Sequence, residues 1–143
     1  MSKSHMKELE VLGRICSRIL KTGRMPSQRS LRLHPSFRKR FERAVRIVKD
    51  RSVNKYVFFP SRRVVWTVKG RSGEYQVMPE TNFCNCNDFF FRVMGFKRQV
   101  CYHIIAQKIA DNLKRYNEFK LRDSDYDRIT EKWRLERPSE AEE

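Results

Sequence analysis

The sequence predicts an α+β protein, with helices toward both ends of the chain and a small antiparallel β-meander between them. Three observations support this prediction. Apolar residues recur at helical spacing in the first fifty residues and again after residue 103. The segment 55–78 is instead rich in β-branched and aromatic residues and is divided by turn signals. Three of the four cysteines fall within residues 84–101, between these two kinds of segment.

The first helix is expected from about Lys3 to Lys21. Gly23 followed by Pro26 ends it, because neither residue continues a helix well. Its apolar stripe contains Leu9, Leu12, Ile15, Cys16, Ile19 and Leu20. Cys16 therefore reads as a core residue, since a free cysteine behaves as a small apolar side chain.

A second helix is expected from about Pro35 to Arg51. One face is apolar and is formed by Phe37, Phe41, Ala44, Val45 and Val48. The remaining surface is crowded with basic side chains, namely Arg38, Lys39, Arg40, Arg43, Arg46 and Lys49. Such a surface suits either solvent or phosphate groups, and the sequence leaves both interpretations open.

The segment 55–78 predicts a meander of two or three strands. A strand-like run at 56–59 is interrupted by Pro60, and a longer run follows at 62–69. The turn signal Gly70-Arg71-Ser72-Gly73 then precedes the alternating residues 74–78.

A third helical segment starts at Cys101-Tyr102-His103 and continues to about Tyr116, and a last helix is expected from Ser124 to Leu135. The end of the chain, from Pro138, is acidic and is expected to be disordered. The chain is thus divided into a basic helical region (1–54), a central finger domain (55–116), and a C-terminal helix with an acidic tail (117–143).

Four residues are candidate metal ligands: Cys84, Cys86, Cys101 and His103. They form a Cys-x-Cys pair and a Cys-x-His pair, separated by fourteen residues. Zinc favours four such ligands in a closed tetrahedral shell, and two tight pairs supply that shell at small entropic cost. An iron–sulfur cluster usually requires four thiolates. A catalytic zinc requires an open coordination position, so the pattern predicts one structural Zn²⁺ ion.

These residues resemble the SWIM-type zinc finger, whose signature is CxC, a variable gap and CxH. The resemblance covers about residues 55–115, in the manner of a small stand-alone member of the family. It implies strands before the first ligand pair, a helix at the second pair, and an acidic and an aromatic residue soon after CxC, here Asp88 and Phe89. Tyr102 departs from the pattern, because a basic residue often lies between the last cysteine and the histidine. The expected architecture is therefore N-terminal helices, the meander, a zinc-binding finger and C-terminal helices.

Between the ligand pairs lie three consecutive phenylalanines, residues 89–91. Phe89 and at least one other are expected to fill the small core over the metal, and one of the three is expected to be exposed. Asp88 is expected to support the metal ligands by accepting a hydrogen bond.

The net charge of the chain is +15, and it is unevenly distributed. Residues 1–110 carry 24 basic against 7 acidic side chains, whereas residues 111–143 carry 8 against 10. Such a balance either serves solubility or indicates a nucleic-acid partner, with DNA favoured over RNA. The candidate contacts are Arg38, Lys39, Arg43, Arg46, Arg62, Arg63, Lys97 and Arg98, with Tyr56, Trp66 or a gap phenylalanine available to stack on a base.

The resemblance adds a second hypothesis. SWIM domains are thought to bind DNA or proteins, and small stand-alone members resemble partners of RecA-family recombinase paralogues in homologous recombination. The chain would then be a protein-interaction module that shares contact with DNA.

An enzyme is not expected, because the sequence has no phosphate-cradling glycine loop, no plausible pair of catalytic carboxylates and no nucleophile–histidine arrangement. The acidic residues Glu118, Asp123, Asp125, Asp127 and Glu131 are interpreted as helix capping and solubility. No apolar run is long enough to span a bilayer, so an intracellular protein of the cytoplasm, nucleoid or nucleus is expected, with no membrane contact.

Overall fold

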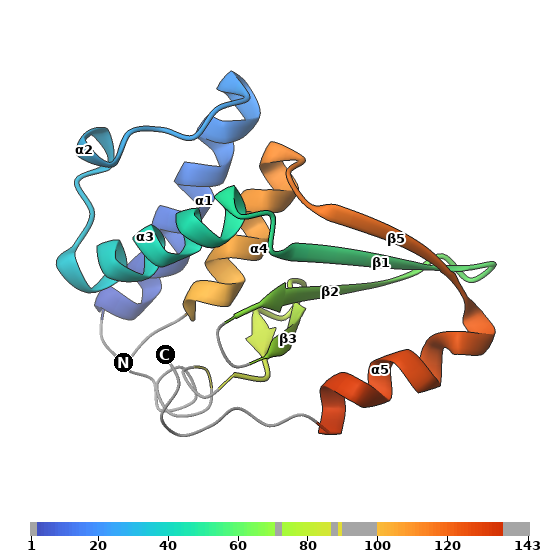
Figure 1. The fold of residues 1–143 in the computed structure, drawn as a ribbon. Helices are drawn as coiled ribbons and strands as arrows, with labels where there is room; N and C mark the ends of the chain where they lie inside the picture. The colour runs from blue at the N-terminus through green and yellow to red at the C-terminus, as the bar shows by residue number, and fades with distance from the viewer. Residues whose placement is uncertain (1–2, 71–72, 87–88, 90–99, 136–143) are drawn as a thin grey trace.

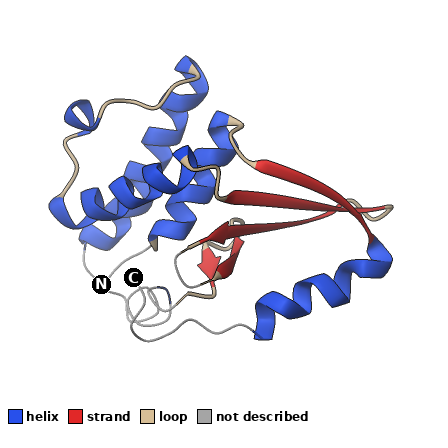
Figure 2. Cartoon of the chain, in the orientation of Figure 1, coloured by secondary structure: helices blue, strands red, loops and turns tan. Residues whose placement is uncertain are grey.

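A five-stranded sheet with helices gathered at one of its ends forms the framework of the protein (Figures 1 and 2). The structure is a computed structural model that describes residues 3–70, 73–86, 89 and 100–135. The strands lie in the order β4-β3-β2-β1-β5. Their bounds are β1 (Val53–Phe59), β2 (Arg63–Lys69), β3 (Glu74–Met78), β4 (Phe83–Cys84) and β5 (Asn117–Arg122).

The first three strands form the antiparallel meander that the alternation and turn signals predict, and β4 extends it by a short fourth strand that was not predicted. β5 is added to the outer side of β1 in the parallel direction, with Asn54 opposite Asn117 and Phe59 opposite Arg122. The predicted α+β class is confirmed, but the sheet is mixed and not purely antiparallel. The division of the chain at residues 54 and 116 remains a prediction.

Three helices pack together beside the sheet: α1 (Lys3–Thr22), α3 (Pro35–Lys49) and α4 (Tyr102–Leu113). A short helix, α2 (Gln28–Leu31), lies in the connection between α1 and α3. The 3-10 turn η2 (Asp123–Asp125) leads into α5 (Tyr126–Leu135), which lies apart from the other helices (Figure 1). Among the described residues, no helix combines the length and apolar character needed to cross a membrane.

α4 ends earlier than the sequence predicts. The expected helix continues to Tyr116, whereas Lys114 adopts the left-handed conformation that terminates the observed helix (φ 59°). The chain then turns into β5, whose side chains are mostly exposed. An exposed edge strand needs no apolar alternation, because its stability comes from backbone pairing with β1, and this explains why the sequence pattern misses it.

The main core lies between the three packed helices and the sheet. It includes Ile15 and Ile19 of α1, Phe41 of α3, and Ile105 and Ile109 of α4, none of which is more than 1% exposed. In a second, smaller cluster, Trp133 of α5 packs with Phe58 of β1 and Val65 of β2. The protein therefore stabilises α5 separately from the helices that surround the cysteines.

One acidic residue has a more specific role than capping or solubility. Asp123 accepts a hydrogen bond from the backbone N–H of Ser61 (2.9 Å) and another from its hydroxyl (2.7 Å). These bonds fasten the turn between β1 and β2 to the segment that precedes α5. We expect Asp123→Ala to reduce the free energy of unfolding by about 1–2 kcal/mol, measured by urea denaturation.

The matched control is Glu131→Ala, which removes an exposed acidic side chain from α5. Its effect is expected to stay within about 0.5 kcal/mol. Equal losses in the two variants would contradict the role given to Asp123.

Candidate metal centre

Four potential ligand side chains converge at the junction of β4 and α4. Cys84 ends β4, Cys86 follows it, Cys101 is the residue before the first turn of α4, and His103 lies within that turn. One ligand atom from each of them lies within 4.8 Å of every other, and all four residues are buried. The structure thus brings together all four of the residues that the spacing singled out.

Asn85, the residue between Cys84 and Cys86, is hydrogen-bonded to both β3 and α5. Asn85 donates its backbone N–H to the carbonyl of Gln76 (3.3 Å), and its side-chain oxygen accepts the N–H of Gln76 (2.9 Å). Its amide nitrogen donates to the carbonyl of Trp133 (3.3 Å). These bonds hold the Cys84–Cys86 turn against β3 and link it to α5.

Aromatic residues enclose the cluster. The ring of His103 lies 4.7 Å from that of Tyr75 and 4.1 Å from that of Tyr102, measured between ring centres. On another side, Phe89 packs edge-on against Phe83 at 4.8 Å. Phe89 is 6% exposed, so its predicted place in the core over the metal site is confirmed, while Phe90, Phe91 and Asp88 lie outside the described residues.

By themselves, the surroundings of the cluster favour neutral cysteine thiols. Burial, reinforced by hydrogen bonding to Cys101, raises the pKa of the Cys84 thiol well above its usual value. The hydrogen bond with Cys101, together with burial, also raises the pKa of Cys86. A divalent cation reverses this tendency, because it stabilises thiolates directly. The backbone N–H of Phe89 already points at the sulfur of Cys86 (3.4 Å), as expected around a thiolate.

The donor set fits a four-coordinate metal ion. An ion about 2.3 Å from each sulfur would hold tetrahedral ligands about 3.8 Å apart. The observed cluster, with every ligand atom within 4.8 Å of the others, therefore needs only a small contraction to close around an ion. Three sulfurs and one imidazole leave no coordination position for a substrate, so a metal here would have a structural role.

The comparisons with known proteins agree with this geometry. The chain is 28% identical over 127 residues to a zinc finger SWIM domain-containing protein 7 homolog from Dictyostelium discoideum, covering 87% of the chain and 81% of the relative. The cluster fits the CxC…CxH ligand pattern of the zinc finger for which this relative is named. No family model matches the chain, and no solved structure matches it. The resemblance expected from the ligand spacing is confirmed by this relative and by the cluster itself.

Near the Cys3His cluster, α3 carries basic residues expected to contact nucleic acid. Arg38, Lys39 and Arg46 are exposed, and Arg43 is half-buried. Arg62 and Arg63 are also exposed, but they lie at the turn between β1 and β2, at the far end of the sheet from α3 (Figure 1). Lys97 and Arg98 lie outside the described residues. The predicted contacts therefore form two separate groups.

The predicted basic surface of α3 wrongly included Arg40. Its side chain is 4% exposed and pairs with Glu8 of α1 through contacts of 3.0 and 2.6 Å. It also donates to the carbonyl of Val100 (2.7 Å), the residue before Cys101. Arg40 is therefore a buried connection between α1, α3 and the segment that enters Cys101, and it is unavailable to phosphate groups.

Two aromatic residues proposed for base stacking pack against other aromatic side chains of the protein. Trp66 is 7% exposed and packs edge-on against Tyr116 at 5.0 Å. Tyr56 stacks on Phe119 (5.1 Å), contacts Trp133 (4.8 Å), and donates its hydroxyl to the carboxylate of Glu74 (2.9 Å). Burial and the neighbouring Glu74 charge raise the pKa of Tyr56. Neither ring is a free platform for a nucleic-acid base.

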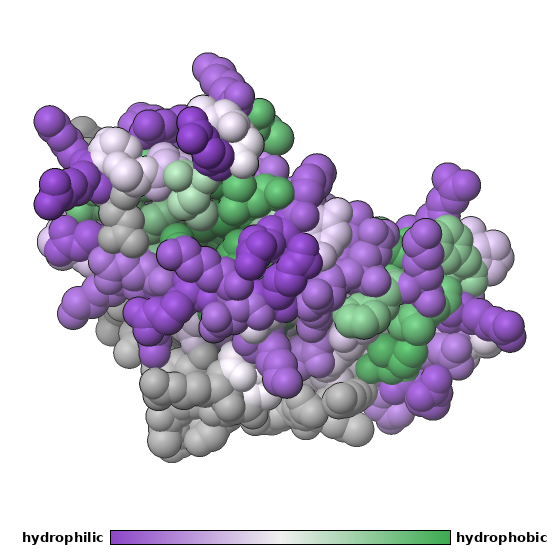
Figure 3. Space-filling model, turned by 45° about the horizontal axis from the view of Figure 1, so that its top comes forward, coloured by the Kyte–Doolittle hydropathy of each residue, from purple (hydrophilic) through white to green (hydrophobic). Residues whose placement is uncertain are grey.

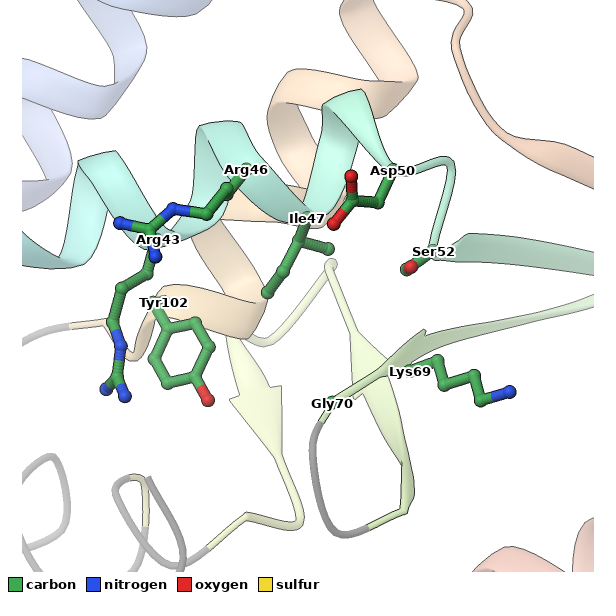
Figure 4. Close-up of a pocket in the computed structure, with 8 residues that line it drawn as sticks. All are labelled: Arg43, Arg46, Ile47, Asp50, Ser52, Lys69, Gly70 and Tyr102. Atoms are coloured by element: carbon green, nitrogen blue, oxygen red, sulfur yellow. The ribbon is translucent and has the colours of Figure 1, made fainter.

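The sequence gives no indication of a pocket that opens between α3, the β2 end and the start of α4 (Figure 4). Its volume is about 480 Å³. The guanidinium of Arg43 lies 4.8 Å from the ring centre of Tyr102, the residue between Cys101 and His103. Arg43 therefore brings a cation beside the position where Tyr102 replaces the expected basic residue.

Proposed function

We propose that the chain is a zinc-stabilised nucleic-acid-binding protein that acts on DNA in recombination or repair, inside the cell. The observation that carries the proposal is the position of the α3 cations next to the SWIM-type cluster. In this proposal the Zn²⁺ ion performs no chemistry, and the protein binds its target without catalysing a reaction.

Zinc is the metal that the donor set supports best. It accepts mixed thiolate and imidazole ligands in a tetrahedral shell. It also has no redox chemistry that would oxidise the three neighbouring cysteines. Its role would be to fix the start of α4 against β4. Because Tyr102 lies between two ligands and contacts Arg43, the metal would also fix one of the cations that face the target.

The α3 surface suits a polyanion for two reasons. Four of its side chains, Arg38, Lys39, Arg43 and Arg46, occur within nine residues and are at least partly accessible. Between Pro35 and Asp50, the only acidic residues are Glu42 and Asp50 itself. Such a concentration of positive charge releases counterions when it meets phosphates, and this release makes the affinity strongly dependent on salt.

We expect the metal-loaded chain to bind a short single-stranded DNA with an affinity that falls steeply between 50 and 200 mM salt. If the four α3 cations each meet a phosphate, the slope of log K against log salt is about −3. Replacing Arg38, Lys39 and Arg46 together by alanine should reduce the slope by about two and weaken binding at least tenfold. Fluorescence anisotropy across a salt series measures both quantities.

The control removes equal charge elsewhere, by replacing Arg14, Lys114 and Arg128, which are 73–76% exposed. This variant should retain most of the affinity. An unchanged slope in the α3 variant, or equal losses in both variants, would refute an α3 interface.

A second candidate function is a protein-interaction module, and an exposed apolar patch favours it. Phe59 and Val64, 39% and 43% exposed, lie at the end of the sheet beyond the packed helices. Val57 pairs directly with Val64 and lies on the same face of β1 as Phe59. An apolar region is visible at that end of the molecule, within a mostly hydrophilic surface (Figure 3). The family resemblance makes a RecA-family protein the partner to test.

We expect the double variant Phe59→Ser with Val64→Ser to abolish co-purification of a RecA-like ATPase if the patch is the contact. Nuclease treatment during purification separates direct contact from a shared nucleic acid. Leu20→Ser is the matched control, because Leu20 is 67% exposed on α1, at a distance from the patch. Recovery of the ATPase with the double variant would exclude this surface.

A further inference from the structure

The pocket beside the metal centre combines cationic, apolar and acidic groups. Its volume of about 480 Å³ lies within the range of about 300–1,000 Å³ that is typical of small-ligand sites. It is lined by Arg43, Arg46, Ile47, Asp50, Ser52, Lys69, Gly70 and Tyr102. Four of these eight residues come from α3 or its C-terminal cap, so a single helix supplies half of the lining (Figure 4).

The cationic part of the pocket is formed by Arg43 and Arg46. The two residues are three positions apart on α3, so their side chains leave the same side of the helix. The aromatic ring of Tyr102 beneath Arg43 favours the position of its guanidinium, at 4.8 Å from the ring centre. Two arginines at this spacing suit one phosphate group. Lys69 extends away from the other lining side chains (Figure 4).

The remaining groups suit a nucleoside better than a second phosphate. Ile47, a half-buried residue of α3, gives the pocket an apolar wall. The carboxylate of Asp50 would repel an additional phosphate, but it can accept a hydrogen bond from the amino group of a base. The hydroxyl of Ser52 can donate or accept beside it.

We propose that this pocket binds one unpaired nucleotide of a nucleic-acid strand. Arg43 and Arg46 bind its phosphate, the base lies against Ile47, and Asp50 accepts a hydrogen bond from a base amino group. The inference rests on the proposed function and specifies where a strand leaves the α3 surface and enters the protein. A base in a duplex is already stacked and paired, so the pocket favours single-stranded segments.

Titration of the metal-loaded full-length chain with adenosine 5′-monophosphate tests the pocket directly, with NMR signals of the Ile47 methyl groups and the Tyr102 ring as the readout. Uridine 5′-monophosphate and inorganic phosphate are the comparison ligands. We expect the adenosine nucleotide to shift both sets of signals. Its affinity should be several-fold higher than that of the uridine nucleotide, which has no exocyclic amino group, and higher still than that of phosphate alone.

Two variants separate the contribution of the phosphate contact from that of the base contact. Arg46→Ala should weaken both nucleotides by about tenfold, as expected for loss of one charge-assisted contact. Asp50→Ala should remove the preference for adenosine over uridine while leaving the uridine nucleotide unaffected. It should not destabilise α3, because a carboxylate at a helix C-terminus opposes the helix dipole. Arg14→Ala, an exposed residue of α1, is the charge control and should leave both affinities unchanged.

The outcomes distinguish this inference from the proposed function. If an oligonucleotide binds with the expected salt dependence but the nucleotides leave Ile47 and Tyr102 unshifted, the pocket assignment is wrong and the function stands. Phosphate binding as tightly as the adenosine nucleotide would also overturn the assignment. If neither oligonucleotide nor nucleotide binds, both the pocket and the nucleic-acid-binding function fail.

Discussion

Removal of the metal is expected to unfold the region around α4 and to lower the melting temperature of the chain sharply. The cluster is part of the main core, and two of its members precede or begin the helix that packs on both α1 and α3. Structural zinc contributes an apparent binding free energy of about 10–16 kcal/mol, which is also folding free energy. Chelation followed by far-UV circular dichroism and thermal melting measures the loss, and elemental analysis should find one zinc per chain.

Cys84→Ser should reproduce the effect of chelation, because it removes one ligand from a fully buried shell. Cys16→Ser is the matched control: Cys16 is a half-buried residue of α1 outside the cluster, and its variant should keep the metal. A metal-free chain with an unchanged helix content and melting temperature would rule out a structural centre.

Arg40→Ala is expected to cost about 3–5 kcal/mol of folding free energy, because it breaks a buried ion pair with the carboxylate of Glu8. It also removes the donor to Val100, so the segment entering Cys101 should loosen and metal affinity should fall. Urea denaturation measures the first effect, and competition with a chromogenic chelator measures the second.

Replacing both partners by methionine, Arg40 and Glu8 together, should recover much of the lost stability, since an apolar pair leaves no buried charge. The exposed pair of Arg14 and Glu10, 3.6 Å apart, provides the contrast: Arg14→Ala should change stability by less than about 1 kcal/mol. If Arg40→Ala lowered the folding free energy no more than Arg14→Ala does, the buried pair of Arg40 and Glu8 would not stabilise the fold.

The clustering of the four candidate ligands could be predicted from the sequence because the information for it is local. Two pairs, each spanning three residues, define the four corners, and the strand and helix on either side follow from short patterns. The three helices and the first three strands were predictable for the same reason, since each has its own apolar periodicity.

The features that could not be predicted depend on contacts between distant segments. Arg40 lies three residues after Phe37 and four before Ala44, so the helical spacing places it at the border of the apolar face. The partner that pairs with it there, Glu8, is 32 positions away and could not be predicted. The pocket brings Lys69 and Tyr102 to α3 only after the sheet has formed. Trp66 and Tyr56 resembled exposed stacking residues because a strand pattern does not reveal which face a later helix or strand will cover.

The parallel pairing of β1 with β5 has a consequence for biosynthesis. β1 is translated more than fifty residues before its neighbour, so the emerging chain presents an open strand edge while the rest of the meander is already complete. Loop closure over such a distance is slow compared with the formation of local hairpins. On the ribosome, the interval before residues 117–122 emerge is therefore the period in which this protein is most exposed to mispairing with other chains.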